Sequence, residues 1–268
     1  MSNLDDPKSR GFPESFTTID RVQVAMLRAL ASADARLVLK GGMAMRVVVG
    51  SMRLTKDVDF DRSNDVSTNA VKASIRKALT HGAQSARLLG SSVDDVKTTP
   101  TTVRMRLAGT ASGALIRFVV EVSGRSPPAA DQYERVTVVP PARYGIAPFV
   151  IDAYTHDMLA ASKVAAIMSP LRNVPRDVYD LDALAAGHPE SILTKQFGRD
   201  VLKAWREDAF EKITAITFDQ AHDELLPSLP PDTRSLFTPA AWEETTLRVA
   251  ECVDQWLSGA LKPRLGPR

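Results

Sequence analysis

A dense run of prolines divides the 268-residue chain into two parts with different patterns. The stretch between residues 125 and 149 contains Pro127, Pro128, Pro140, Pro141 and Pro148. Because proline lacks a backbone N–H and fixes φ, this stretch disfavours long regular elements and indicates a connecting region. We therefore expect one domain over residues 1–148 and a second over residues 149–268.

The first part has the pattern of a mixed α/β domain. An arm to about residue 19 reads as irregular, and helical spacing of apolar residues follows over residues 20–32 and 66–79. Residues 43–49 are expected to form a short helix that ends at Gly50. Short apolar or alternating runs predict strands over residues 36–40, 57–61, 101–107 and 115–123.

The second part is predicted to be all-α. Helices are expected over residues 154–168, 176–186, 193–213 and 240–257. Thr238 and Pro239 supply an N-cap and a first-turn proline for the last of them.

Charge and composition exclude several classes of protein. Thirty-four Lys and Arg against thirty-two Asp and Glu leave a net charge of +2, so any nucleic-acid contact must come from a local patch. The single cysteine, Cys252, cannot form an internal disulfide, which fits a reducing compartment, and we expect a cytoplasmic protein. No stretch approaches the roughly 18 apolar residues of a membrane span, so no membrane partner is expected.

Two aspartates in the sequence DVDFD are the most informative residues of the chain. Asp57 and Asp59 lie two apart on a predicted strand and therefore project from one face, about 6.6 Å apart. At an effective dielectric constant near 20 their charges repel by about 2.5 kcal/mol, so such a site holds a cation or protonates one acid. Magnesium, a hard ion that prefers carboxylate oxygens, is the natural candidate. The alternative is an acidic face that simply points into solvent.

Other common sites are excluded by spacing. An EF-hand loop that begins at Asp57 would place Arg62 where glycine is needed and Thr68 where glutamate is needed. The sequence contains no Walker A motif, nucleophile elbow or zinc-binding His-Glu-x-x-His helix, and its four histidines form no cluster.

The stretch over residues 39–61, LKGGMAMRVVVGSMRLTKDVDFD, resembles motif I of the DNA polymerase β-like nucleotidyltransferase superfamily, in particular the AbiEii/MenT type of toxin from bacterial toxin–antitoxin systems. The matching residues of this motif are Lys40, Gly41, Gly42, Arg53, Thr55, Asp57 and Asp59. A second family segment, a helix with a lysine followed by Arg-Asp-x-x-Asp-Leu, is matched by Lys163, Arg172, Arg176, Asp177 and Asp180. The resemblance covers roughly residues 36–184.

This resemblance implies an α+β fold, in which a polymerase β-like domain with a small mixed sheet precedes an all-α domain that completes the active-site cleft. It also implies transfer of a nucleoside monophosphate from an NTP to an acceptor hydroxyl, with release of pyrophosphate. The acceptor class it suggests is RNA, in particular the 3′ end of tRNA, and the partner it suggests is a separately encoded antitoxin protein.

The resemblance implies a metal centre in the first domain. Asp57 and Asp59 would hold two magnesium ions, with a third carboxylate from a neighbouring strand. Glu121, within the apolar run RFVVEVS, is the candidate, because an ionised group among strand-forming residues is costly unless paired or metal-bound. An exposed edge-strand position would explain Glu121 equally well.

Nucleotide contacts are implied for Lys40, Gly41, Gly42, Arg53, Thr55, Lys163, Arg176 and Asp177. The glycines would offer backbone N–H groups to the triphosphate. Met43 stands where the superfamily commonly has Ser or Thr.

In the second domain, Lys163 would contact the triphosphate, and Asp177 and Asp180 would close the site, one of them assisting deprotonation of the acceptor or positioning Lys163. A lysine that reaches solvent and a salt-bridged surface helix are the corresponding alternatives.

Basic residues near the site, among them Arg104 and Arg106, could bind triphosphate or an RNA backbone.

The leading hypothesis is therefore a metal-dependent nucleotidyltransferase toxin that acts on RNA. A second hypothesis keeps the fold but has a small molecule or a protein side chain as acceptor. A third is a catalytically silent nucleotide or RNA binder, motivated by Met43.

Overall fold

The structure is a computed structural model that describes residues 2–33, 35–63, 65–170, 172 and 174–262. It forms two compact units, one comprising Met1–Thr155 and Pro230–Asp232 and the other His156–Leu229 and Thr233–Arg268. The predicted boundary near residue 148 precedes the last strand, β8 (Phe149–Tyr154), which lies in the first unit.

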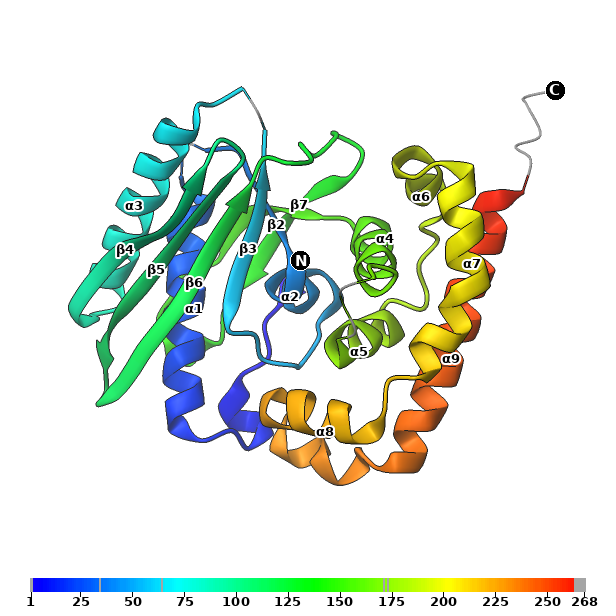
Figure 1. Cartoon of the computed structure of the whole chain (residues 1–268). Coiled ribbons are helices and arrows are strands. Elements are labelled where there is room, and N and C mark those ends of the chain that lie inside the picture. Colours follow the sequence, from blue (N-terminus) through cyan, green and yellow to red (C-terminus); the bar gives the residue numbers. More distant parts are fainter. Residues whose placement is uncertain (1, 34, 64, 171, 173, 263–268) are drawn as a thin grey trace. The chain divides into compact units, whose positions relative to one another are not determined.

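The first unit is built on a mixed sheet of eight strands in the order β1-β7-β8-β2-β3-β6-β5-β4 (Figure 1). β3 (Asp57–Arg62) lies at its centre, antiparallel to β2 (Leu37–Lys40) and parallel to β6 (Ala114–Ser123). The remaining strands are β1 (Ser2–Asn3), β4 (Leu89–Thr99), β5 (Thr102–Ala111) and β7 (Tyr133–Val139).

Two long helices, α1 (Glu14–Ala31) and α3 (Thr68–Ser85), cover one face of this sheet (Figure 1). That face is apolar, since Val58, Phe60 and Val120 are fully buried. Gly82 lets the helices approach closely, because a Cβ there would lie 2.6 Å from the Met26 sulfur. Side chains alternate along a strand, so Asp57, Asp59 and Glu121 project from the opposite face.

A buried ion pair ties the short helices to α1. The chain leaves β2 into α2 (Gly41–Ala44) and the π-helical turn Met45–Val49, which ends at Gly50 in the left-handed conformation. Arg46 of this turn pairs with Asp20 of α1, and both are almost fully buried. The Tyr144 hydroxyl donates a 2.6 Å hydrogen bond to the same carboxylate from the short helix Ala142–Tyr144.

The second unit is helical, and its described helices are α4 (His156–Ile167), α5 (Pro175–Ala183), α6 (Glu190–Gln196), α7 (Arg199–Thr214), α8 (Phe218–Leu225) and α9 (Pro239–Leu261). Two buried tryptophans of α9 hold loop carbonyl groups through their indole N–H groups. Trp242 donates to the Ile216 carbonyl at 2.8 Å, and Trp256 donates to the Gly187 carbonyl at 3.0 Å. Across the described residues, no helix has the length and apolar character to span a membrane.

The fold class predicted from the sequence is confirmed, but several elements differ. The first helix begins at Glu14, so residues 14–19 are not irregular. The helix predicted over residues 193–213 is two helices, because the backbone is extended at Phe197 and Gly198.

Four strands were absent from the prediction, the first of them the two-residue β1 within the arm that was expected to be irregular. β4 is exposed along almost its whole length, so it lacks the apolar alternation that marks a half-buried strand. β7 and β8 lie inside or next to the proline-rich stretch, and both form because prolines bound the strands without interrupting them.

The buried ion pair makes a prediction about stability. Asp20→Asn should lower the free energy of unfolding by about 3–5 kcal/mol, because it leaves the buried Arg46 guanidinium without a counter-charge. Asp152→Asn, which removes a 3.7 Å ion pair between the half-buried Asp152 and the exposed Arg135, should cost no more than about 1 kcal/mol. Chemical denaturation of the full chain measures both, and equal losses would contradict this account.

Candidate active site

The carboxylates predicted to form the site lie on the face of β3 and β6 opposite to the one that α1 and α3 cover. We call this the open face of the sheet. In the parallel pairing of these strands, Asp59 is the register partner of Glu121, and Asp57 is the partner of Val119. Asp57 is exposed, whereas Asp59 and Glu121 are half-buried. The tertiary structure therefore brings Glu121 next to the Asp-x-Asp pair, as predicted, and excludes the edge-strand alternative because β6 is flanked by β3 and β5.

Burial and the two neighbouring acids change the pKa of Asp59. The pKa of Asp59 is raised to about 6, mainly by burial and then by the neighbouring charges of Asp57 and Glu121, which together outweigh the lowering effect of Lys40 and Arg104. A carboxyl with such a pKa is poised between its neutral and charged forms near neutral pH, which is typical of functional sites.

Cations stand at both ends of a row of register partners across four strands. Lys40 of β2 is the partner of Asp59, and Arg104 of β5 is the partner of Glu121. The Arg104 Nε lies 3.0 Å from a Glu121 carboxylate oxygen. The two inner acids of the row are thus balanced by two outer bases.

The oxygen donors of Asp57, Asp59 and Glu121 suit a hard divalent cation. Within the described part of the chain, however, no group of three or more His, Cys, Asp or Glu side chains is close enough together to hold a metal ion as placed. Glu121 is turned to Arg104, so its carboxylate would have to exchange one cation for another. The magnesium assignment stays a prediction, with a donor set that fits it.

Two glycines allow the start of α2 to lie against these residues. Gly41 has φ +66°, and a Cβ there would lie 2.7 Å from the Asp59 Oδ2 atom. A Cβ on Gly42 would lie 2.8 Å from the Thr55 hydroxyl oxygen and 3.3 Å from an Arg53 guanidinium nitrogen. The start of α2 therefore lies against Asp59, Thr55 and Arg53, with backbone where side chains would not fit.

Met43 is fully buried in the core. It occupies the position where the superfamily commonly carries a hydroxyl, so this side chain packs inside the unit and is not available to a phosphate.

Lys40 has a partner besides Asp59. Its ammonium lies 2.7 Å from one oxygen of the buried Asp61, and the Tyr154 hydroxyl donates to the other oxygen at 2.6 Å. Asp61 and Tyr154 thus hold Lys40 at the end of β2. Sequence reasoning missed this role, although Asp61 continues the alternation of Asp57 and Asp59.

Gln23 of α1 is a further supporting residue that sequence reasoning missed. Its buried side-chain amide donates to the Thr55 carbonyl at 2.9 Å and the Lys56 carbonyl at 3.2 Å. These bonds fix the loop that delivers Asp57. A single glutamine within an apolar helix face is the only signal of this contact in the sequence.

The site residues predicted in the second unit form a buried cluster of their own. The Lys163 ammonium lies 2.8 Å from an Asp177 oxygen and 2.6 Å from an Asp180 oxygen. Arg172 lies 2.7 Å from the other Asp177 oxygen. Both aspartates are at most 1% exposed, so the surface-helix and solvent-reaching alternatives are wrong.

Arg176 lies apart from this cluster. It pairs with Glu224 of α8, although it lies four residues before Asp180, which is the spacing of an ion pair along a helix. The cluster belongs to the second unit, the carboxylates belong to the first, and a nucleotide role for these residues stays a prediction.

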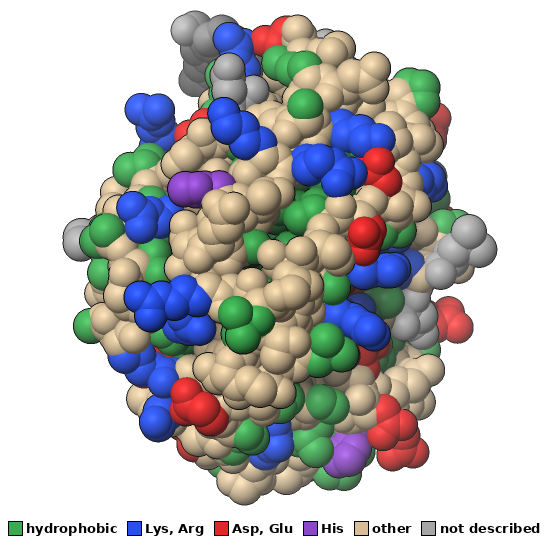
Figure 2. Space-filling view, turned by 90° about the vertical axis from the view of Figure 1, so that its left-hand side faces the viewer, with side chains coloured by type: hydrophobic (Ala, Val, Ile, Leu, Met, Phe, Trp, Pro, Cys, Tyr) green, Lys and Arg blue, Asp and Glu red, His purple; other side chains and the backbone are tan. Residues whose placement is uncertain are grey.

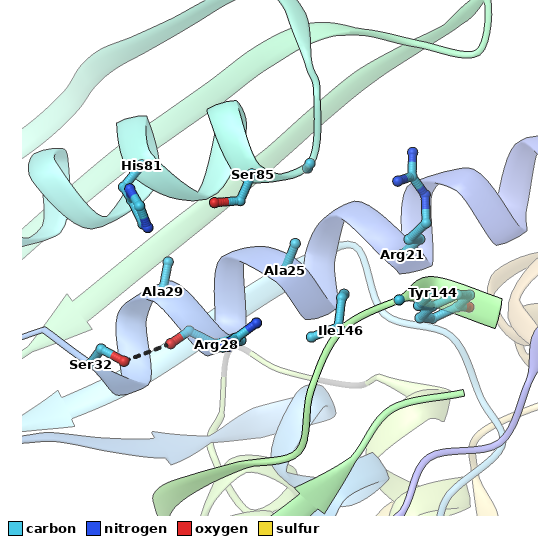
Figure 3. A pocket seen from close by; sticks show the side chains of 11 residues that line it. Arg21, Ala25, Arg28, Ala29, Ser32, His81, Ser85, Tyr144 and Ile146 are labelled. Carbon is cyan, nitrogen blue, oxygen red and sulfur yellow. Dashed lines mark hydrogen bonds between the residues drawn. The ribbon is translucent and has the colours of Figure 1, made fainter. Parts of the chain in front are cut away.

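A pocket of about 350 Å³ lies elsewhere in the first unit, between α1 and α3 (Figure 3). His81 and Ser85 of α3 face Ala25 and Ala29 of α1 across it. Its walls include none of the predicted site residues, and it lies on the helix-covered side of the sheet.

The pKa of Asp59 predicts how stability depends on pH. Between about pH 3.8 and 6 the folded, metal-free protein keeps a proton on Asp59 that the unfolded chain has released, so this group's contribution to stability is lost as pH rises. Asp59→Asn should remove that fall in the free energy of unfolding, measured by denaturation in EDTA.

Asp57→Asn should lower the upper limit of this pH window, because it removes a charge that raises the pKa of Asp59 in the folded protein. An unchanged pH profile in Asp59→Asn would contradict the assignment.

Comparisons with known proteins agree with this geometry. A family model described as "Nucleotidyl transferase AbiEii toxin, Type IV TA system" matches residues 25–251. A search of curated proteins finds no match.

Two solved structures from Helicobacter pylori share the fold, each at 18% identity and a TM-score of 0.57 over 93% of this chain. One is a candidate nucleotidyltransferase, of which 97% is covered, and the other is JHP933, of which 95% is covered. The family match extends over both the carboxylate strands and the Lys163 cluster, and the chain belongs to the AbiEii family of nucleotidyltransferase toxins of type IV toxin–antitoxin systems.

Proposed function

We propose that this chain transfers a nucleoside monophosphate from an NTP to a hydroxyl of an RNA acceptor, with tRNA as the acceptor class, in the cytoplasm. The observation that carries the proposal is the juxtaposition of Asp59, Glu121 and Asp57 at the start of α2. Membership of the family supports nucleotidyl transfer and an antitoxin partner.

In the proposed reaction, the acceptor oxygen forms a bond to the α-phosphorus of the NTP as the bond from that phosphorus to the pyrophosphate oxygen breaks. Two magnesium ions bound by Asp57, Asp59 and Glu121 would activate the hydroxyl and neutralise charge on the triphosphate. Glu121 is the carboxylate that we assign to accept the hydroxyl proton.

The residues around α2 would bind the triphosphate. Gly41 and Gly42 carry no side chain that would keep a phosphate from their backbone N–H groups, and the Arg53 guanidinium lies against Gly42. Thr55 donates its hydroxyl to the Asp57 carbonyl at 3.2 Å, which orders the turn into β3. Lys40 adds a positive charge beside Asp59.

The test is incubation of the full chain with each labelled NTP, magnesium and total bacterial RNA, resolved on a denaturing gel. Label should enter a tRNA-sized band, and Asp57→Asn and Asp59→Asn should each reduce it by more than the roughly 10–100-fold that loss of a metal-supporting residue costs. Asp152→Asn, on a half-buried carboxylate of β8 that is not one of the three site acids, is the matched control.

Magnesium binding measured by calorimetry gives a second readout, and it should be lost in Asp59→Asn. Label in a small molecule or in protein would replace RNA as the acceptor. Nucleotide binding without label anywhere would identify a silent binder.

Gly41 and Gly50 form a matched pair for a further prediction. Both have φ in the left-handed region, so alanine at either should cost about 1–2 kcal/mol of stability. A Cβ at Gly50 meets nothing within 4 Å, whereas at Gly41 it displaces the Asp59 carboxylate. Gly41→Ala should therefore abolish transfer and Gly50→Ala should retain it, and equal activities would refute the close approach.

A further inference from the structure

We infer that Lys97, Arg106 and Arg117, on the open face of β4, β5 and β6, bind the phosphate backbone of the acceptor RNA. We name these three residues the basic strip. The inference rests on the proposed function, since it takes the acceptor to be RNA, and it adds the surface that receives the strand.

The register places the basic strip beside the carboxylates. Lys97 is the partner of Arg104, which is the partner of Glu121, so these side chains share one row of the open face. Arg106 lies two residues from Arg104 on β5, about 6.6 Å along the strand. Arg117 lies four residues from Glu121 on β6, about 13 Å along it.

The cations of the basic strip are exposed, and none of them forms an ion pair or hydrogen bond through its side chain with the residues that the structure describes. On the opposite face the comparable cations are paired, since Lys72 and Arg76 of α3 both bind Asp95 of β4. An acid on the same face is Asp94, the register partner of Arg106, and its carboxylate accepts a 3.4 Å hydrogen bond from the Ser92 hydroxyl.

Electrostatics explains why an RNA acceptor needs such a strip. Asp57, Asp59 and Glu121 repel a polyanion, and a net charge of +2 gives little long-range attraction. Figure 2 shows, on the side of the molecule that carries α3 and β4, basic side chains spread among acidic ones. Local unpaired arginines, which bind phosphate through two parallel hydrogen bonds, therefore have to hold the strand.

The experiment measures RNA binding without NTP, so that no transfer occurs. The double variant Arg106→Gln/Arg117→Gln is compared with Arg28→Gln/Lys77→Gln, which removes the same charge from exposed positions on α1 and α3. The probe is a short, mixed-sequence, fluorescently labelled single-stranded RNA. Its affinity is followed by anisotropy between about 50 and 200 mM salt.

Each phosphate contact contributes about 0.7 to the slope of log affinity against log salt for a single strand, so the strip variant should lose about 1.4 from the slope. The helix-side variant should keep the wild-type slope. Equal slopes in the two variants would overturn the inference, and circular dichroism with thermal melting verifies that both are folded.

Polyglutamate is the second probe. If the strip variant loses affinity for polyglutamate and keeps its RNA slope, the strip binds an acidic polypeptide and the inference fails. Transfer to RNA is assayed separately with the wild-type protein. A wild type that binds RNA through the strip but labels none overturns the proposed function alone, and labelled RNA with unchanged slopes overturns the strip alone.

Discussion

The repulsion between carboxylates on one face of β3 and β6 is the constraint on which the rest of the first unit depends. Parallel pairing sets Asp59 directly opposite Glu121, on strands about 4.8 Å apart, and Asp57 follows on the same face. Burial of Asp59 makes this arrangement costlier still, as its pKa of about 6 reflects. A fold that keeps these acids together must balance them or bind a cation.

The surrounding structure supplies that balance through the strands themselves. Lys40 and Arg104 flank the two inner acids in one row of register partners. Asp61 and Tyr154 hold Lys40, and Gln23 fixes the loop before Asp57. The positive φ of Gly41 then lets the chain turn into α2 against the Asp59 carboxylate. Each of these contacts positions a charged side chain of the site, and none of them depends on the net charge of the chain.

In the second unit, buried carboxylates are likewise balanced by cations, in a cluster of their own. Lys163 bridges two aspartates, and Arg172 binds one of them from a half-exposed position. Buried ion pairs often add little net stability, because desolvation offsets their attraction, whereas removal of one partner is costly. The two carboxylates hold the Lys163 ammonium in one place.

The sequence by itself determined the class of fold and the identity of the acids. Asp57 and Asp59 had to share a face because side chains alternate along a strand, and the motif around them indicated the family that the comparisons show. Long helices with strong periodicity, such as α3 and α9, were also predictable, because the apolar residues of their buried faces recur at helical spacing along the sequence.

Only the tertiary structure decided which residues meet across the sheet. Register between distant strands placed Glu121 opposite Asp59 and Arg104 opposite Glu121, and no local pattern encodes that pairing. The exposed strand β4 left no signal for the same reason, since its hydrogen bonds to β5 hold it in place without an apolar face. Periodicity reports burial along one segment, whereas a site built from several strands depends on contacts between segments.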